Sequence, residues 1–196
     1  MSDYKPLVIL MNEDMLKAFS GFDKDNPESY FKAHKRAKKP PMEGLWGKTR
    51  KGLIPSVNKF LNVNDRQIQN TWEQHLKEYC EFCMKKQGFK HNYIDQCIIL
   101  TIQFKPTKAK SDNNNIYSKP FIDAMVEREL IKEDNYTVVQ FHAEYSVVDK
   151  NVPHSEIRIY IIDEEHDFAC AMYTLVNDVI ELNDKYNGWQ IELYSI

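Results

Sequence analysis

The sequence predicts an α+β domain in which helices pack on a mixed β-sheet. Three observations indicate this class. Some segments carry apolar residues at helical intervals of three and four, others are continuous or alternating apolar runs typical of strands, and the two kinds are interspersed along the 196 residues. A chain of this length, 42% hydrophobic, can bury one core without metals or disulfides. We therefore expect one domain with extensions at both ends.

Three segments have the periodicity of amphipathic helices. The clearest is 65–87, where apolar residues recur every three or four positions and Gly88 is suited to end the helix. Pro120 suits the first turn of a second helix, 118–130, and a third is expected over 168–182. We expect two or three helices of this kind to pack on the sheet.

Other segments have the patterns of strands. The run 94–104 is almost continuously apolar, as is typical of an interior strand, and 139–147 alternates between apolar and polar residues. We expect 139–147 to pair with 157–161 as an antiparallel hairpin, because only a short turn separates them. Two further strands are expected over 6–11 and over 189–194, which would close the sheet.

The apolar stretches are too short for a membrane segment, since a bilayer span needs about 20 residues. The first residues lack the basic flank and cleavage site of a signal peptide, which predicts a cytoplasmic protein.

Cys80 and Cys83 have the two-residue spacing of many zinc sites, yet both fall inside the clearest helix. We interpret them as core residues, with zinc binding or redox chemistry as the alternatives.

The formal net charge of −3 hides a strong asymmetry along the chain. Residues 32–110 carry a net +11, whereas residues 111–196 carry a net −11. A basic middle region favours a polyanionic partner. The acidic last part suits metal ligands, a surface for a protein partner or solvated exterior.

The basic charge is densest in 32–51, which has eight Lys or Arg and one acid. Weak helical periodicity over 29–39 ends at a proline pair, and an exposed basic loop follows. Two interpretations are equally open. The segment is either a solvated face, or a set of phosphate contacts with Phe31 or Trp46 stacking on a base. On the second, the nucleic-acid-binding residues are Lys35, Arg36, Lys38, Lys39, Trp46, Lys48, Arg50 and Lys51.

Two aspartates flank the predicted interior strands. Asp112 lies beyond the end of 94–104, and Asp134 lies just before 139–147. If these strands are antiparallel neighbours, both carboxylates face one point, where they could hold Mg²⁺ for phosphodiester hydrolysis with Lys119 at the phosphate. The alternative is plain turn and cap chemistry, with Lys119 pairing on the helix surface with Asp123 four residues on.

Several short motifs occur in a distinctive order. They are Pro55-Ser56-Val57-Asn58, the strand end Phe104-Lys105-Pro106, an Asp-x-Asn-Asn loop from Asp112, the helix Lys119–Met125 with Asp123-Ala124, and Glu133-Asp134 before a Val-rich strand. Taken together, this order resembles the RusA-like Holliday junction resolvases. The resemblance covers residues 55–162. It leaves 1–54 as an N-terminal extension with the basic loop, and 163–196 as an acidic C-terminal helix and strand.

The resemblance implies a phage or prophage homodimer that cuts branched, four-way junction DNA with Mg²⁺ or Mn²⁺. Asp112 and Asp134 match catalytic metal ligands of that family, and Lys119 matches its lysine, with one extra residue before it. Asn114 stands where the family has a second aspartate, so it would be a weaker oxygen ligand, while Asn115 matches the family asparagine. The implied nuclease is therefore weakened or inactive.

A second function remains open beside the nuclease. The same fold could serve as a non-catalytic regulator that binds nucleic acid or protein. Its acidic C-terminal part would then offer a surface to a protein partner. That surface includes Asp163, Glu164, Glu165 and Asp167.

Overall fold

A computed structural model describes residues 4–23, 25–39, 53–90, 93–107 and 116–186. Within these ranges, four strands form one mixed sheet accompanied by six helices, which confirms the α+β class. The strands are β1 (Leu7–Met11), β2 (Cys97–Lys105), β3 (Val139–Val148) and β4 (His154–Ile161). The helices are α1 (Glu13–Ser20), α2 (Pro27–Ala33), α4 (Val57–Leu61), α5 (Arg66–Lys86), α6 (Lys119–Glu127) and α7 (Phe168–Tyr186).

Helix α5 forms as its sequence predicts. The Asp65 carboxylate caps its N-terminus by accepting hydrogen bonds from the backbone N–H groups of Gln67 and Ile68. Just after its C-terminus, Gly88 adopts a φ of +78°, which suits glycine. Cys80 and Cys83 are fully buried in the apolar stripe that faces the sheet, so they are core residues. Burial raises the pKa of the Cys83 thiol to about 12.

The strand order is β1-β4-β2-β3. Strand β4 lies between β1 and β2 and is antiparallel to both, whereas β2 and β3 run parallel. The expected hairpin of β3 with β4 is therefore wrong, and so is the antiparallel pairing of β2 with β3. Helix α6 connects β2 to β3, and a helical crossover returns the chain to the same end of the sheet.

The connection from β3 to β4 crosses the end of β2. Asp149 donates its backbone N–H to the carbonyl of Lys105 at 2.8 Å. Its carboxylate accepts from the N–H groups of Asn151 and Val152 at 2.9 and 3.0 Å, which tightens the turn. The chain then reaches the far side of β2, where β4 begins.

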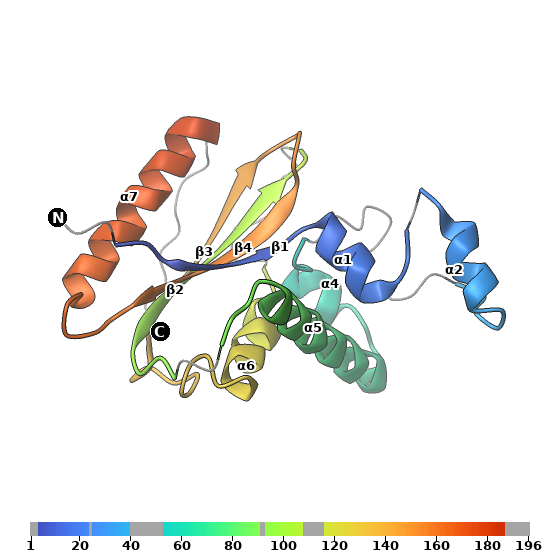
Figure 1. The fold of residues 1–196 in the computed structure, drawn as a ribbon, viewed down its shortest axis with the longest axis horizontal. Coiled ribbons are helices and arrows are strands. Elements are labelled where there is room, and N and C mark those ends of the chain that lie inside the picture. The colour runs from blue at the N-terminus through green and yellow to red at the C-terminus, as the bar shows by residue number, and fades with distance from the viewer. Residues whose placement is uncertain (1–3, 24, 40–52, 91–92, 108–115, 187–196) are drawn as a thin grey trace.

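The sheet separates two cores (Figure 1). Helices α5 and α6 cover one face, where Ile9, Ile99 and Ile159 are buried against them. Helix α7 covers the opposite face and buries Leu100 and Tyr160. Strand β1, from the N-terminal part of the chain, belongs to the same sheet.

Helix α2 lies at the end of the molecule away from the sheet (Figure 1). It ends at Ala33, so the helical pattern expected over 29–39 is realised only in its first part. Among the helices of the described residues, none combines the length and the apolar composition of a membrane span. The strand expected over 189–194 lies outside the described residues.

Candidate functional site

The buried polar side chains of the described residues gather at one place. They are Thr101 and Gln103 of β2, Ser146 of β3, Ser155 of β4, and Ser118 just before α6. In the sheet register, Gln103 is opposite both Ser146 and Ser155, and Thr101 is opposite Glu144. We call this group, together with His142 and Glu144 of β3, the polar face.

His142 and Glu144 are the titratable groups at the centre of the polar face. The His142 Nε2 atom lies 3.1 Å from the Thr101 hydroxyl oxygen, and burial lowers the pKa of this imidazole to about 4. Burial also raises the pKa of Glu144, although its carboxylate accepts hydrogen bonds from the Ser118 hydroxyl at 2.8 Å and from the Ile116 N–H. Near neutral pH the site therefore combines an uncharged imidazole with a poorly hydrated carboxylate.

Two chain segments lie over the polar face. Ile54 donates its N–H to the Ser155 hydroxyl at 3.2 Å and accepts from the Gln103 side chain. Ser56 forms an antiparallel bridge with Ile116. These segments directly follow residues 40–52 and 108–115, which contain the expected basic loop and Asp112. The described residues that follow both stretches of candidate residues therefore lie at the polar face.

Asp112, Asn114 and Asn115 lie outside the described residues, so their roles stay predictions. Asp134 is exposed and precedes the start of β3. Because β2 and β3 are parallel, that start lies beside the start of β2, about 26 Å along the strand from the end that leads to Asp112. The antiparallel pairing that was expected to bring the two aspartates together is therefore absent, and the role of Asp134 stays a prediction.

Lys119 is the first residue of α6. Its Nζ lies 3.3 Å from a carboxylate oxygen of Asp123, one helical turn on, and its side chain is two-thirds exposed. Asp123 also pairs with Lys77 of α5 at 3.4 Å. This is the surface pairing that was the alternative to a phosphate contact, although Lys119 remains accessible to a phosphate.

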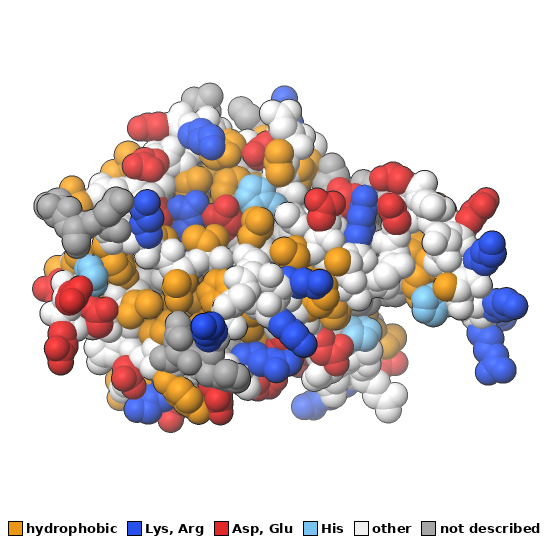
Figure 2. Space-filling model, viewed as in Figure 1, with side chains coloured by type: hydrophobic (Ala, Val, Ile, Leu, Met, Phe, Trp, Pro, Cys, Tyr) orange, Lys and Arg blue, Asp and Glu red, His pale blue; other side chains and the backbone are white. Residues whose placement is uncertain are grey.

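The described part of the basic segment follows α2. Lys35, Arg36, Lys38 and Lys39 are all exposed, and Figure 2 shows Lys and Arg side chains gathered at this end of the molecule. Phe31 is half-buried, with its ring against Phe22 and Tyr30, so it is part of an aromatic cluster rather than a free stacking surface. The remaining candidates lie outside the described residues, namely Trp46, Lys48, Arg50 and Lys51.

In the described part of the chain, no group of three or more His, Cys, Asp and Glu side chains could hold a metal ion. A cation at the polar face would have Glu144 and His142 as ligands, and would need further oxygen atoms from the neighbouring segments. The Ser146 hydroxyl, which is buried and has no hydrogen-bond partner among the described residues, fits such a donor set. The carboxylate oxygens suit Mg²⁺ and Mn²⁺ alike, whereas an imidazole ligand disfavours Mg²⁺, which takes oxygen donors.

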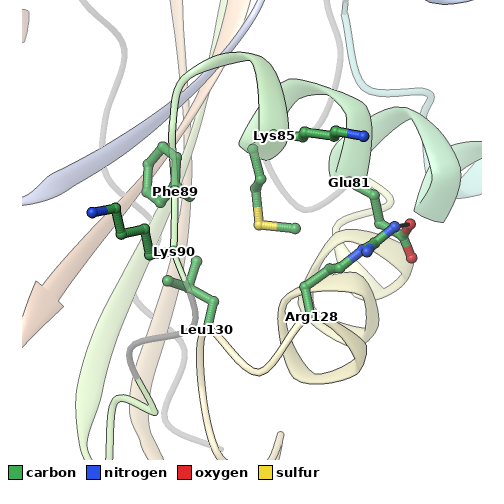
Figure 3. A pocket seen from close by; sticks show the side chains of 7 residues that line it. Glu81, Lys85, Phe89, Lys90, Arg128 and Leu130 are labelled. Atoms are coloured by element: carbon green, nitrogen blue, oxygen red, sulfur yellow. Dashed lines mark hydrogen bonds and ion pairs between the residues drawn. The ribbon is translucent and has the colours of Figure 1, made fainter.

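A separate pocket of about 260 Å³ lies beside the C-terminal end of α5. Figure 3 shows Arg128 directed at Glu81, with which it forms an ion pair, while Lys85 and Lys90 point away from each other. Its cations therefore do not converge on one anion. The lining residues are Glu81, Met84, Lys85, Phe89, Lys90, Arg128 and Leu130.

Sequence reasoning did not identify the polar face. Alternation alone would place Gln140, His142, Glu144 and Ser146 on a solvent-facing side of β3, but this side is largely covered. A usable signal was present in β2, where Thr101 and Gln103 interrupt an apolar interior strand on one face. Polar residues at interior positions imply polar partners across the sheet.

In comparisons with known proteins, no protein-family model matches the chain, and no curated protein matches it. The resemblance to RusA-like resolvases therefore rests on the motifs alone.

Proposed function

We propose that this protein is a metal-dependent endonuclease acting on branched DNA, with its divalent cation bound at the polar face. The observation that supports this proposal is the position of the half-buried Glu144 and His142 side chains on one face of β3, beside the described residues that follow the segments carrying Asp112 and the basic loop. Glu144 thus takes the ligand position expected of Asp134. Loops that follow parallel strands are common positions for phosphate and metal sites.

In this proposal each group has a defined task. Asp112 and Glu144 hold the cation, with Asn114 as a weaker ligand, and the neutral His142 imidazole ligates it or accepts a proton. The cation, Mg²⁺ or Mn²⁺, would activate water and stabilise the leaving oxygen of a phosphodiester. Lys35, Arg36, Lys38 and Lys39 contact phosphates beyond the cut site, and Lys119 adds positive charge nearby. The protein acts as a homodimer, as the resemblance implies, and in the cytoplasm.

A cleavage assay on a synthetic four-way junction tests the proposal. We expect cleavage that requires Mg²⁺ or Mn²⁺, is abolished by Asp112→Asn, and falls at least about tenfold in Glu144→Gln, since that change removes a charged ligand. Asp134→Asn is the matched control and should cut within about twofold of the wild type. Loss of cleavage in Asp134→Asn with full cleavage in Glu144→Gln would restore the aspartate pair and refute the proposed site.

A second candidate is a non-catalytic regulator that binds nucleic acid or protein. It is favoured by the separation of Asp134 from the strand end that leads to Asp112, and by the engagement of Lys119 with Asp123. Its signature is junction binding that weakens steeply with salt, or a thermal shift with a protein partner, without cleavage by either metal. Within the acidic surface proposed for a protein partner, the carboxylates of Asp163 and Asp167 accept hydrogen bonds from the backbone N–H groups of His166 and Cys170. These two carboxylates therefore also have a local structural role.

A further inference from the structure

The pocket beside the C-terminal end of α5 forms because of the way that this helix ends. Gly88 takes the left-handed conformation, with a φ of +78°, and turns the chain back on the helix. The Gly88 N–H donates to the Lys85 carbonyl at 3.2 Å. The Phe89 N–H donates to the Met84 carbonyl at 3.0 Å, which completes a Schellman motif. Phe89 and Met84 therefore line the same side of the pocket.

Helix α6 ends in the same way and supplies the other side of the pocket. Glu129 has a φ of +56°, and the Leu130 N–H donates to the Met125 carbonyl at 2.9 Å. Leu130 is buried after this turn, whereas Arg128 remains exposed and pairs with Glu81 of α5. Because both helices contribute one wall, we call this space the α5–α6 pocket.

The interior of the α5–α6 pocket is apolar and small. Met84 is 3% exposed, Leu130 is 1% exposed, and Phe89 is half-buried. The volume of about 260 Å³ is below the range of about 300–1,000 Å³ that is usual for small-molecule sites. Such a space suits one bulky apolar side chain, to which the flexible thioether of Met84 can adapt.

The rim of the α5–α6 pocket carries an excess of positive charge. Lys85, Lys90 and Arg128 line it together with a single acid, Glu81. Both lysines are exposed, and neither has an ion-pair partner among the residues that the structure describes. The three cations are spread around the rim and do not point at one centre (Figure 3). This arrangement suits a ligand that carries several separate negative charges.

A second hollow, of about 250 Å³, adjoins the α5–α6 pocket. The two share Phe89 and Lys90, and the second is otherwise lined by Leu7, Gln87 and Gly88. A polypeptide that passes over Phe89 can therefore place one side chain in each hollow. Lys90 lies beside both of these positions.

We propose that these two adjoining hollows bind an acidic peptide segment of a partner protein, which places bulky apolar side chains in the hollows. Its carboxylates lie against Lys85, Lys90 and Arg128. Charge complementarity selects this occupant, because a buried apolar anchor inside a charged rim is the usual form of a peptide-binding hot spot. A nucleobase fits less well, since the apolar interior leaves the hydrogen-bonding groups on its edges without partners.

This site is separate from the polar face. The Leu130 carbonyl accepts from the Ile94 N–H at 2.9 Å, just before β2 begins, whereas Gln103 of the polar face lies near the end of that strand. Peptide binding at the α5–α6 pocket therefore does not depend on the cation proposed at the polar face.

Methyl NMR of the full-length protein labelled with ¹³C-methyl methionine tests the proposal. The probe is a synthetic peptide with two phenylalanines between runs of aspartate. We expect it to shift the methyl signal of Met84, which lines the α5–α6 pocket. The signal of Met172, which packs against the core under α7 on the opposite face of the sheet, should not move. Met84→Leu and Met172→Leu identify the two signals.

Changes to the peptide and to the rim separate the two contributions. Replacing the phenylalanines by serine, or the aspartates by asparagine, should each weaken binding at least about tenfold. The double variant Lys85→Glu with Lys90→Glu should also weaken binding at least about tenfold, and exposed positions tolerate such changes. Lys150→Glu, at an exposed lysine between β3 and β4, is the matched control and should bind within about twofold of the wild type.

Four results would overturn the proposal. Equal binding of the serine peptide would show attraction by charge alone, and equal binding by the double variant would place the peptide elsewhere. A single-stranded oligonucleotide of the same net charge that shifts Met84 at lower concentration than the peptide would make this a nucleic-acid site. An unchanged Met84 signal with peptide up to about 1 mM, the weak end of specific binding, would show that the pocket takes no such ligand.

Discussion

The polar side chains on the two faces of the sheet differ in whether they have oppositely charged partners. Under α7, Arg158 donates to Glu156 at 2.9 Å and to Asp178 at 2.8 Å, and Tyr160 donates to the same Asp178 oxygen at 2.7 Å. His154 completes the group by pairing with Glu156 at 3.2 Å. Every charge in this network has an opposite charge beside it, so it joins α7 to the sheet and leaves little capacity for a ligand.

The polar face, on the opposite side, has no such neutralisation. Among the described residues Glu144 receives hydrogen bonds but no cation, His142 contacts a hydroxyl, and the Ser146 hydroxyl has no partner. Buried groups left in this condition carry a cost in stability, which is the usual mark of a site that binds something. We therefore interpret the group under α7 as a structural network and the polar face as a candidate site, although both contain His and Glu.

The largest effect is expected from the network. Arg158→Met leaves the half-buried Asp178 without its cation and Glu156 with His154 alone, and should lower the free energy of unfolding by about 3 kcal/mol. Urea unfolding measures this loss. Lys132→Met, which removes an exposed pair with Asp95, is the control and should cost less than about 1 kcal/mol. Similar losses for both variants would show that the network is no more than a surface pair.

The two histidines should respond to pH with opposite signs. Burial holds the pKa of His142 at about 4, so the unfolded chain takes up the proton first and the wild type loses up to about 3 kcal/mol as the pH falls from 6.5 to 4. His142→Gln should remove that loss. Unfolding of both proteins across this pH range makes the comparison, and parallel pH profiles would contradict the burial of His142.

For His154, burial is outweighed by its bonds to Glu156 and the Val152 carbonyl, which raise the pKa. Its stabilisation is complete below pH 6.5 and is lost as the pH rises through the folded-state pKa. His154→Gln should therefore be most destabilised relative to the wild type at acidic pH and approach it at alkaline pH. A deficit that grows with pH would contradict the pairing with Glu156.

The smallest effects compare two serines of the polar face. The Ser155 hydroxyl accepts from the buried Ile54 N–H, so Ser155→Ala should cost about 1 kcal/mol or slightly more. Ser146→Ala removes a hydroxyl that has no partner among the described residues, and should leave stability within about 0.5 kcal/mol of the wild type or raise it. Thermal unfolding measures both, and equal losses would indicate that Ser146 is satisfied.

The local structure was largely predictable from the sequence, whereas the sheet order was not. Helical spacing with Asp65 and Gly88 predicted α5, and alternation predicted β3, because both patterns depend on near neighbours. The hairpin prediction failed because the turn after Asp149 crosses the end of β2. The helix predicted between β2 and β3 nevertheless favours a parallel pair, because a helical crossover joins parallel strands. That argument is stronger than the assumption that the two strands are antiparallel so that Asp112 and Asp134 can meet.

The site was harder to predict than the fold. Glu144 and His142 matter because 54–56 and 116–118 lie over them, and no spacing within β3 indicates that contact. Short motifs drew attention to Asp134 instead, which the parallel sheet places at the start of β3. The resemblance supplied candidate metal-ligand residues. Which of these residues can lie close together depends on the directions of the strands, which the motifs do not give.

The most direct test of the central claim is a manganese titration followed by electron paramagnetic resonance, which reports free Mn²⁺. We expect the wild type and Asp134→Asn to reduce the free Mn²⁺ signal equally, and Glu144→Gln to reduce it far less. Equal binding by the wild type and Glu144→Gln, with binding lost in Asp134→Asn, would place the cation at the other end of the sheet and contradict the account.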